Sequence, residues 1–359
     1  MPDPNPVPGA RVLPGVVEEL LRGLAPRVLG ALVRRFGQFD ACEDAVQEAL
    51  IAAAARWPAA GVPDRPQAWL AAVARRSLVD HWRSESARRR REEVAAGLAA
   101  GDPGPAPAGT DDTLTLFFLC CHPALSTASQ LALALRAVGG LTTAQVAAAF
   151  LVPEGTLARR IHRAKQSIRA SGAEFRMPPP AERKERLGVV LHALYLLFNE
   201  GYTTSAGPVL QRPDLTREAI RLTRLLHRSL PAEGEVSGLL ALMLLTDARR
   251  AARTDERGAI VPLAEQRRDL WDAASIAAGV ALVTRTLGTS PVGPYQVQAA
   301  IAAVHDEAPT AEATDWPQIL ALYDVLARIA PGPLVTLSRA VAVAMVRGPR
   351  ADLALLGTL

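Results

Sequence analysis

The residues best suited to chemistry lie in the segment VPEGTLARRIHRAK (152–165), which is rich in arginine. From this segment to position 168, four apolar residues recur at helical spacing and predict one buried stripe: Leu157, Ile161, Ala164 and Ile168. Arg159, Arg160 and Arg163 fall on the other faces of this helix. Guanidinium groups pair with guanine edges and with phosphates, so the predicted chemistry is nucleic-acid binding.

A second short helix must position this basic helix. Thr142 and Gln145 have the spacing of a capping box and predict a helix start. We expect the short helix to be followed by a tight turn, with Pro153 at the first position of the basic helix. This order is typical of a DNA-binding helix-turn-helix. The alternative is a helical hairpin with a solvated basic face.

An acidic helix is predicted earlier, over residues 40–57. Its small apolar residues form one stripe, and its polar residues cluster on the opposite side: Glu43, Asp44, Gln47 and Glu48. A rigid helix with such a face suits docking of a basic partner. The alternative is an acidic face that only meets solvent.

A basic helix is expected to follow, from Gln67 to about Glu93, after a proline-bounded loop over 58–66. It carries Arg75, Arg76 and Arg83, the run 88–91, and two tryptophans, Trp69 and Trp82. Basic residues near aromatic residues suit single-stranded or melting DNA. The alternative places both tryptophans in the core, and for Trp69 we favour it.

Composition limits the fold and the function class. Only 4% of the residues are aromatic and 49% are hydrophobic, which favours packed helices and predicts an all-α fold. The chain has three cysteines, no long apolar run and no signal-peptide pattern, so we expect a reduced cytoplasmic protein. We expect no membrane partner, no cofactor and no metal site, since the chain contains none of the common nucleotide-binding or catalytic motifs.

Proline- and glycine-rich breaks divide the chain. We predict a tail over 1–15, a helical domain over 16–99, a linker over 100–110, a helix-turn-helix domain over 111–176 and a larger helical domain over 181–359. The net charge is +4, and the whole positive excess lies in the first half of the chain.

These features in this order resemble a bacterial sigma factor of the extracytoplasmic-function group, which keeps only regions two and four. The matching motifs are EDAVQEAL (43–50), QAWLAAVARRSLVDHWR (67–83) and VPEGTLARRIHRAK (152–165). FFLCCHPAL (117–125) and LYLLFNEGY (194–202) are similar to a subgroup with a long C-terminal helical extension related to tetratricopeptide repeats. In that subgroup the extension is thought to take over the control that anti-sigma proteins exert elsewhere.

The resemblance implies core RNA polymerase and promoter DNA as partners. It implies that Glu43, Asp44, Gln47 and Glu48 dock on the clamp helices of the β′ subunit. It assigns the −10 element to Arg75, Arg76, Asp80, Trp82 and Arg83. It assigns the −35 element to Glu154, Thr156, Arg159, Arg160, Arg163 and Lys165. The linker would pass toward the RNA exit path. The β subunit of the polymerase is a further implied partner, and no enzymatic activity is implied.

Two features depart from the pattern. Arg76 stands where the family usually has asparagine, and the helix-like end ADLALLGTL (351–359) has no return helix, as in a shortened or truncated extension.

Two other function classes remain open. One is a helix-turn-helix regulator with a helical sensor domain that acts without polymerase. The other is an enzyme on the C-terminal domain, with Glu200 and Tyr202 as acid–base groups; alternatively FNEGYTTSAGP (198–208) is a capped loop, a ligand site or a contact with the sigma domains.

Overall fold

The computed structural model describes residues 14–92, 111–205 and 210–348, and these residues form fourteen α-helices and three short 3₁₀ helices. Within these ranges the only β interaction is an isolated bridge between Thr254 and Ile260, so the predicted all-α class is confirmed. The chain divides into two compact units, Met1–Ala193 and Leu194–Leu359. The division falls inside one helix, α8 (Pro180–Tyr202).

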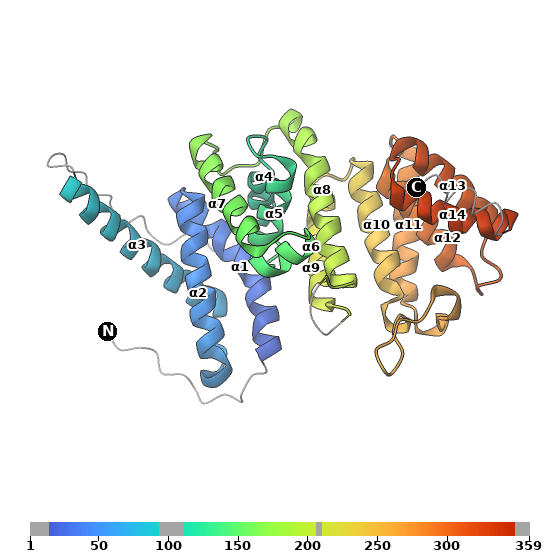
Figure 1. The fold of residues 1–359 in the computed structure, drawn as a ribbon, viewed down its shortest axis with the longest axis horizontal. Coiled ribbons are helices and arrows are strands. Elements are labelled where there is room, and N and C mark those ends of the chain that lie inside the picture. Colours follow the sequence, from blue (N-terminus) through green and yellow to red (C-terminus); the bar gives the residue numbers. More distant parts are fainter. Residues whose placement is uncertain (1–13, 93–110, 206–209, 349–359) are drawn as a thin grey trace. The chain divides into compact units, whose positions relative to one another are not determined.

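Three long helices open the first unit: α1 (Pro14–Phe36), α2 (Phe39–Ala60) and α3 (Pro66–Glu92) (Figure 1). The turn between α1 and α2 has left-handed backbone at Gly37 and Gln38. The stripe of small residues on α2 faces inward, as predicted from the spacing. Trp57 is fully buried, and the ring of the half-buried Trp69 packs edge-to-face on it, with 5.4 Å between the ring centres. Trp69 therefore packs against the core, which is the placement that we favoured.

Four shorter helices follow: α4 (Thr113–Cys120), α5 (Thr127–Ala137), α6 (Thr143–Ala149) and α7 (Glu154–Ala170). The Thr142–Gln145 capping box is present, with both reciprocal hydrogen bonds. Pro153 is the N-cap of α7, so the expected placement at its first helical position was wrong by one residue. The buried stripe of α7 is confirmed for all four apolar residues.

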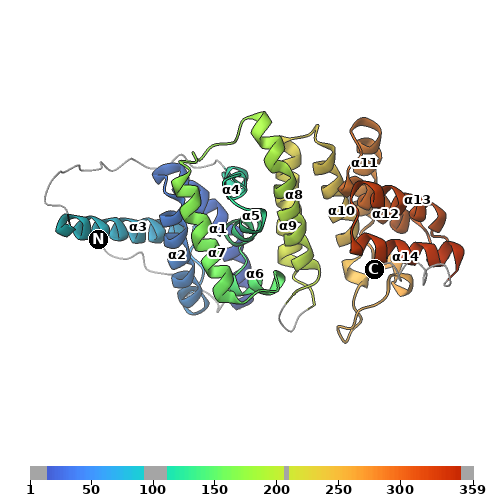
Figure 2. The same cartoon turned by 45° about the horizontal axis from the view of Figure 1, so that its top comes forward.

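The second unit consists of the end of α8 and six further helices. They are α9 (Pro213–Ser229), α10 (Gly234–Ala248), α11 (Ala273–Thr289), α12 (Pro294–Glu307), α13 (Trp316–Ile329) and α14 (Pro333–Arg347). Each helix from α9 to α14 packs on the next one along the chain, and α10 also packs on α12 (Figures 1 and 2). This local packing is typical of helical repeat arrays.

Some predictions concern residues outside the described part of the chain. These are most of the tail (1–13), the linker (100–110) and the C-terminal segment (349–359); the side chains of the run 88–91 are also outside it. In the described ranges, no helix has both the length and the apolar character needed to cross a bilayer.

We predict that the stability of the second unit depends on pH through Asp306 on α12. Its side chain is fully buried, 3.5 Å from Nη1 of Arg249. Burial raises the pKa of Asp306 from 3.8 to about 7, although Arg249 and Arg268 oppose the rise. The folded form therefore holds this proton more tightly, and the stability it contributes is lost as the pH rises from about 4 to 7. The neighbouring His305 acts oppositely, because burial lowers its pKa to about 4.

The variant Asp306→Asn isolates the Asp306 contribution. Relative to this variant, the wild type should lose on the order of 2–4 kcal/mol of stability between pH 4 and 7. Hydrogen exchange of α12 amides in the full-length chain, corrected for the intrinsic pH dependence of exchange, measures it. A difference between the two proteins that stays constant with pH would contradict the assignment.

Candidate nucleic-acid interface

The basic side of α7 faces solvent. Arg159 and Arg163 are exposed and Arg160 is half-buried. Arg159 donates to Oγ1 of Thr156 at 3.4 Å, and Arg163 donates to the carbonyl oxygen of Arg159 at the same distance. We call Glu154, Thr156, Arg159, Arg160 and Arg163 the recognition face. The face lies at and after the N-terminal end of α7, which is the part of a recognition helix that enters a major groove.

Lys165 does not lie on this face, contrary to the grouping that the resemblance implied. It is 8% exposed and lies on the same side of α7 as Ile161 and Ile168. Helical geometry explains this position. Lys165 is four residues after Ile161 and three before Ile168, so the three share a side of the helix, whereas Arg160 lies about 140° around the helix axis from Lys165. Although burial opposes the charged form, Glu43 and Asp44 raise the pKa of Lys165.

The turn before α7 contains a strained residue. Leu151 has φ of 53° and its side chain is 93% exposed. A left-handed backbone costs a leucine about 1 kcal/mol and is easier for asparagine. Leu151→Asn should therefore raise stability by about 1 kcal/mol, seen as a rise of a few degrees in the melting temperature. Leu151→Ala, which keeps the backbone strain, is the matched control, and an equal rise in both would contradict this explanation.

The acidic helix α2 presents its polar residues unevenly. Asp44 and Glu48 are exposed and Gln47 is half-buried. Glu43 is only 4% exposed, so its predicted place on the polar side was wrong: it precedes the buried Val46 by three residues and shares the inward side of the helix. The carboxylate of Glu48 accepts a hydrogen bond from Ser77 on α3. We call Glu43, Asp44, Gln47 and Glu48 the docking set.

Sequence reasoning missed one residue beside the docking set. Ile51 is 70% exposed and follows Gln47 and Glu48 by one helical turn. An isolated exposed isoleucine is ordinary, but one that adjoins an acidic strip supplies the apolar centre that interfaces use. The helical spacing could have predicted this exposure, since Ile51 falls on the polar side of α2 and its next neighbours are alanines.

The predicted melting residues lie on the first five turns of α3. Arg75, Arg76, Asp80 and Arg83 are exposed, and Arg83 lies 3.6 Å from Asp80. Trp82 is half-buried: its ring packs edge-to-face on Phe36, and its Nε1 donates to Oε1 of Gln38 at 3.1 Å. Trp82 is thus anchored at the end of α1 while part of its ring remains accessible. The arginines and this ring form a basic surface with one aromatic edge.

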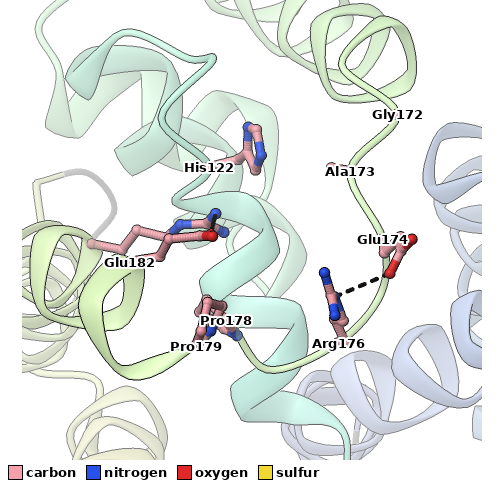
Figure 3. A pocket seen from close by; sticks show the side chains of 9 residues that line it. His122, Gly172, Ala173, Glu174, Arg176, Pro178, Pro179 and Glu182 are labelled. Carbon is pink, nitrogen blue, oxygen red and sulfur yellow. Dashed lines mark hydrogen bonds and ion pairs between the residues drawn. The ribbon is translucent and has the colours of Figure 1, made fainter.

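A small pocket of about 210 Å³ lies where the chain leaves α7 and enters α8 (Figure 3). Its arginines have carboxylate partners: Arg176 pairs with Glu174 at 3.0 Å and Arg186 with Glu182 at 2.8 Å. Arg186 also donates to the carbonyl oxygen of Phe118. These contacts hold the start of α8 against α4. Because the arginines of the pocket are paired with carboxylates, we interpret the pocket as a structural junction between helices.

The polar segment 198–208 contains a capped loop in its described part, 198–205. Glu200 is buried and accepts hydrogen bonds from the backbone and hydroxyl of Ser205, at 3.0 and 2.5 Å. Arg253 stacks on the ring of Tyr202, 3.6 Å from its centre, and donates to Thr203. Glu200 and Tyr202 therefore have structural partners, which favours the capped loop over acid–base groups.

Comparisons with known families identify the first unit. Residues 20–88 match the family described as Sigma-70 region 2, and residues 118–168 match Sigma-70, region 4. The chain belongs to the sigma-70 family. Residues 186–287 match a third family, a family of unknown function (DUF6596). The chain is thus a sigma factor of extracytoplasmic-function type with a C-terminal extension, and it binds core RNA polymerase and promoter DNA.

One relative aligns with most of this chain. An uncharacterized protein of Rhizobium meliloti (strain 1021) is 44% identical over 352 residues, which cover 96% of this chain and 83% of the relative. The sigma factor matches no solved structure.

Proposed function

We propose that this sigma factor docks on core RNA polymerase through α2, recognises the −35 element with α7, and captures and opens the −10 element with α3. The observation that carries the proposal is that Asp44, Glu48 and Ile51 on one helix, and Arg159 and Arg163 on another, are exposed. Two surfaces of opposite charge on one chain suit a basic protein partner and DNA.

The docking step draws on charge and apolar contact together. Asp44 and Glu48 provide charge complementarity to a basic partner, and Ile51 provides apolar area at the centre of the strip. Binding to polymerase then tethers both DNA-binding surfaces, which raises their effective concentration at the promoter.

The two DNA elements are recognised in different states. The exposed arginines of α7 suit base edges and phosphates of duplex DNA in the major groove. On α3, Arg75, Arg76 and Arg83 would hold phosphates while the accessible part of Trp82 stacks on an unpaired base. Stacking and phosphate contacts offset the few kcal/mol needed to unstack each base.

Footprinting with polymerase tests this division of labour. Holoenzyme with the full-length chain should protect both elements and make −10 thymines reactive to permanganate. Arg75→Ala/Arg76→Ala should lower that reactivity several-fold while −35 protection persists. Loss of both signals together would contradict the separate roles of α3 and α7.

We further propose that the C-terminal extension regulates initiation. The described residues of the second unit pack as a helical array of their own, and such arrays serve as binding surfaces. A protein shortened after Ala193, compared with the full chain in transcription with core polymerase, tests this proposal. Equal transcript yields from the two proteins would contradict it.

A further inference from the structure

A basic patch lies in the second unit, where α9 ends and α10 begins. Three exposed arginines and one half-buried histidine form the basic patch: Arg224, His227, Arg228 and Arg285. The first three belong to α9 and the last to α11, and both helices pack on α10. The hydroxyl of Thr286 donates to the carbonyl oxygen of Gly234 at 3.4 Å, so this turn of α11 lies at the start of α10, close to the end of α9.

The charges of the basic patch converge without a carboxylate to balance them. Burial lowers the pKa of His227, and the charges of Arg285 and Arg228 lower it further. Two guanidinium groups from different helices therefore act on one imidazole. Elsewhere on α9, Arg221 pairs with Glu218 at 2.7 Å. Within the described part of the chain, none of the three patch arginines has such an ion pair.

The simplest alternative is that these bases stabilise the C-terminal end of α9. Cations in the last turn of a helix interact favourably with its free carbonyl groups, which accounts for His227 and Arg228. It does not account for Arg285, which belongs to another helix, and like charges four residues apart, such as Arg224 and Arg228, destabilise a helix. A ligand with several negative charges would relieve this repulsion.

We propose that the basic patch binds the phosphate backbone of duplex DNA that flanks the −10 and −35 elements. The C-terminal extension is then a third DNA-binding surface of this sigma factor. Guanidinium groups form paired hydrogen bonds with phosphate oxygens, and such contacts carry no sequence information of their own. The inference goes beyond the proposed function, because it does not depend on which helices recognise the two elements.

The surroundings of the basic patch suit DNA better than a protein partner. The structure describes α9 and α11 over their whole length, and neither exposes a large apolar side chain. Protein interfaces usually have an apolar centre. The exposed apolar side chains of this unit lie elsewhere, as Leu334 and Val341 on α14 do.

The spacing of the patch arginines also fits a nucleic-acid strand. Arg224 and Arg228 are four residues apart on one helix, which separates them by about 6 Å along its axis. Phosphates of one DNA strand recur every ~3.4 Å along the duplex axis. The two arginines can therefore contact next-but-one phosphates of one strand, while Arg285 on α11 adds a third contact beside them.

Covalent attachment to the first unit strengthens such contacts. The chain binds promoter DNA, so DNA is the polyanion with the highest effective concentration around the second unit once the holoenzyme is on a promoter. Contacts too weak to bind free DNA then add to promoter affinity. The expected contribution is independent of sequence and falls steeply with salt.

A triple variant of the full-length chain tests the basic patch. It replaces the three patch arginines by glutamine, and its matched control replaces three exposed arginines of the same unit outside the patch. The substitutions are Arg224→Gln/Arg228→Gln/Arg285→Gln and, in the control, Arg257→Gln/Arg328→Gln/Arg347→Gln. Both variants lose the same charge, and both should keep the helix content of the wild type in circular dichroism because all six side chains are exposed.

The readout is holoenzyme affinity for two fragments of one promoter, at several salt concentrations. One fragment keeps long natural flanks, and the other is trimmed to the protected −35 to −10 region. On the long fragment the patch variant should bind at least about tenfold more weakly, with the salt slope reduced by about 2–3. On the trimmed fragment it should bind like the wild type, and the control variant should do so on both.

Two outcomes would overturn the proposal. One is equal affinity and equal salt slope of the patch variant and the wild type on the long fragment. The other is weaker binding of the patch variant to core polymerase without DNA, with an unchanged salt slope on DNA, which would identify an acidic protein surface as the partner. Because core affinity is measured separately, a failure of docking by α2 shows in that measurement and leaves the DNA result distinct.

Site-specific cross-linking provides an independent measurement. Ser229 is exposed next to the basic patch, and the native cysteines are buried, so a photoreactive group on Ser229→Cys labels one position. Holoenzyme with this label should cross-link to DNA outside the two elements. The same group on Ala321→Cys, exposed on α13, should not. Absence of cross-links from position 229, or equal cross-linking from both positions, would contradict the proposal.

Discussion

The double variant Asp44→Lys/Glu48→Lys is expected to lose core-polymerase binding by at least about 100-fold. Both carboxylates are exposed on α2 next to Ile51, so the change converts attraction for a basic partner into repulsion without touching the core. Retention of the chain on immobilised polymerase measures the effect. Circular dichroism should show unchanged helix content, because neither residue is buried.

A matched control keeps the change in net charge the same. Asp64→Lys/Glu174→Lys also replaces two exposed carboxylates of the first unit, outside the docking set, and should bind polymerase like the wild type. Continued copurification of Asp44→Lys/Glu48→Lys with polymerase would contradict docking by α2.

Arg159→Ala or Arg160→Ala is expected to weaken −35 recognition by about 1–3 kcal/mol, roughly 5- to 150-fold, where the arginine contacts a base edge. Arg159 is exposed near the N-terminal end of α7, the end that enters the groove. The measurement is holoenzyme binding to promoter fragments with varied −35 bases at several salt concentrations. A base contact relaxes specificity at one position, whereas a phosphate contact lowers affinity uniformly and reduces the salt slope by about one.

Arg176→Ala is the control for the −35 prediction. Arg176 is exposed but lies beyond the end of α7 and pairs with Glu174, so its loss should leave sequence preference unchanged. An unchanged promoter footprint for the Arg159→Ala and Arg160→Ala variants would contradict the recognition face.

Much of the first unit could be predicted from local patterns. The capping box at Thr142 and the apolar stripe of α7 depend only on neighbours in sequence, and both are present. Burial of Lys165 was within reach of the helical spacing. Its carboxylate partners were not, because Glu43 and Asp44 lie more than a hundred residues away and only tertiary packing brings them together.

In the second unit too, contacts that depend on tertiary packing could not be predicted from the sequence. Helical segments were predicted from periodicity, but no sequence pattern indicated that Asp306 is buried, because one aspartate in a helix is ordinary. Its raised pKa arises from burial within α12 beside Arg249. Conversely, Glu200 attracted attention by its polar neighbours, yet its role in the described loop is to hold Ser205.

Run-off transcription tests sigma-factor activity most directly. Core polymerase free of other sigma factors would be supplied with the full-length chain and with fragments from upstream of the genes that neighbour its own. We predict a specific transcript that requires the chain and disappears with Asp44→Lys/Glu48→Lys. No transcript, together with a salt-sensitive shift of a palindromic fragment by the chain alone, would contradict the account and identify a helix-turn-helix regulator that acts without polymerase.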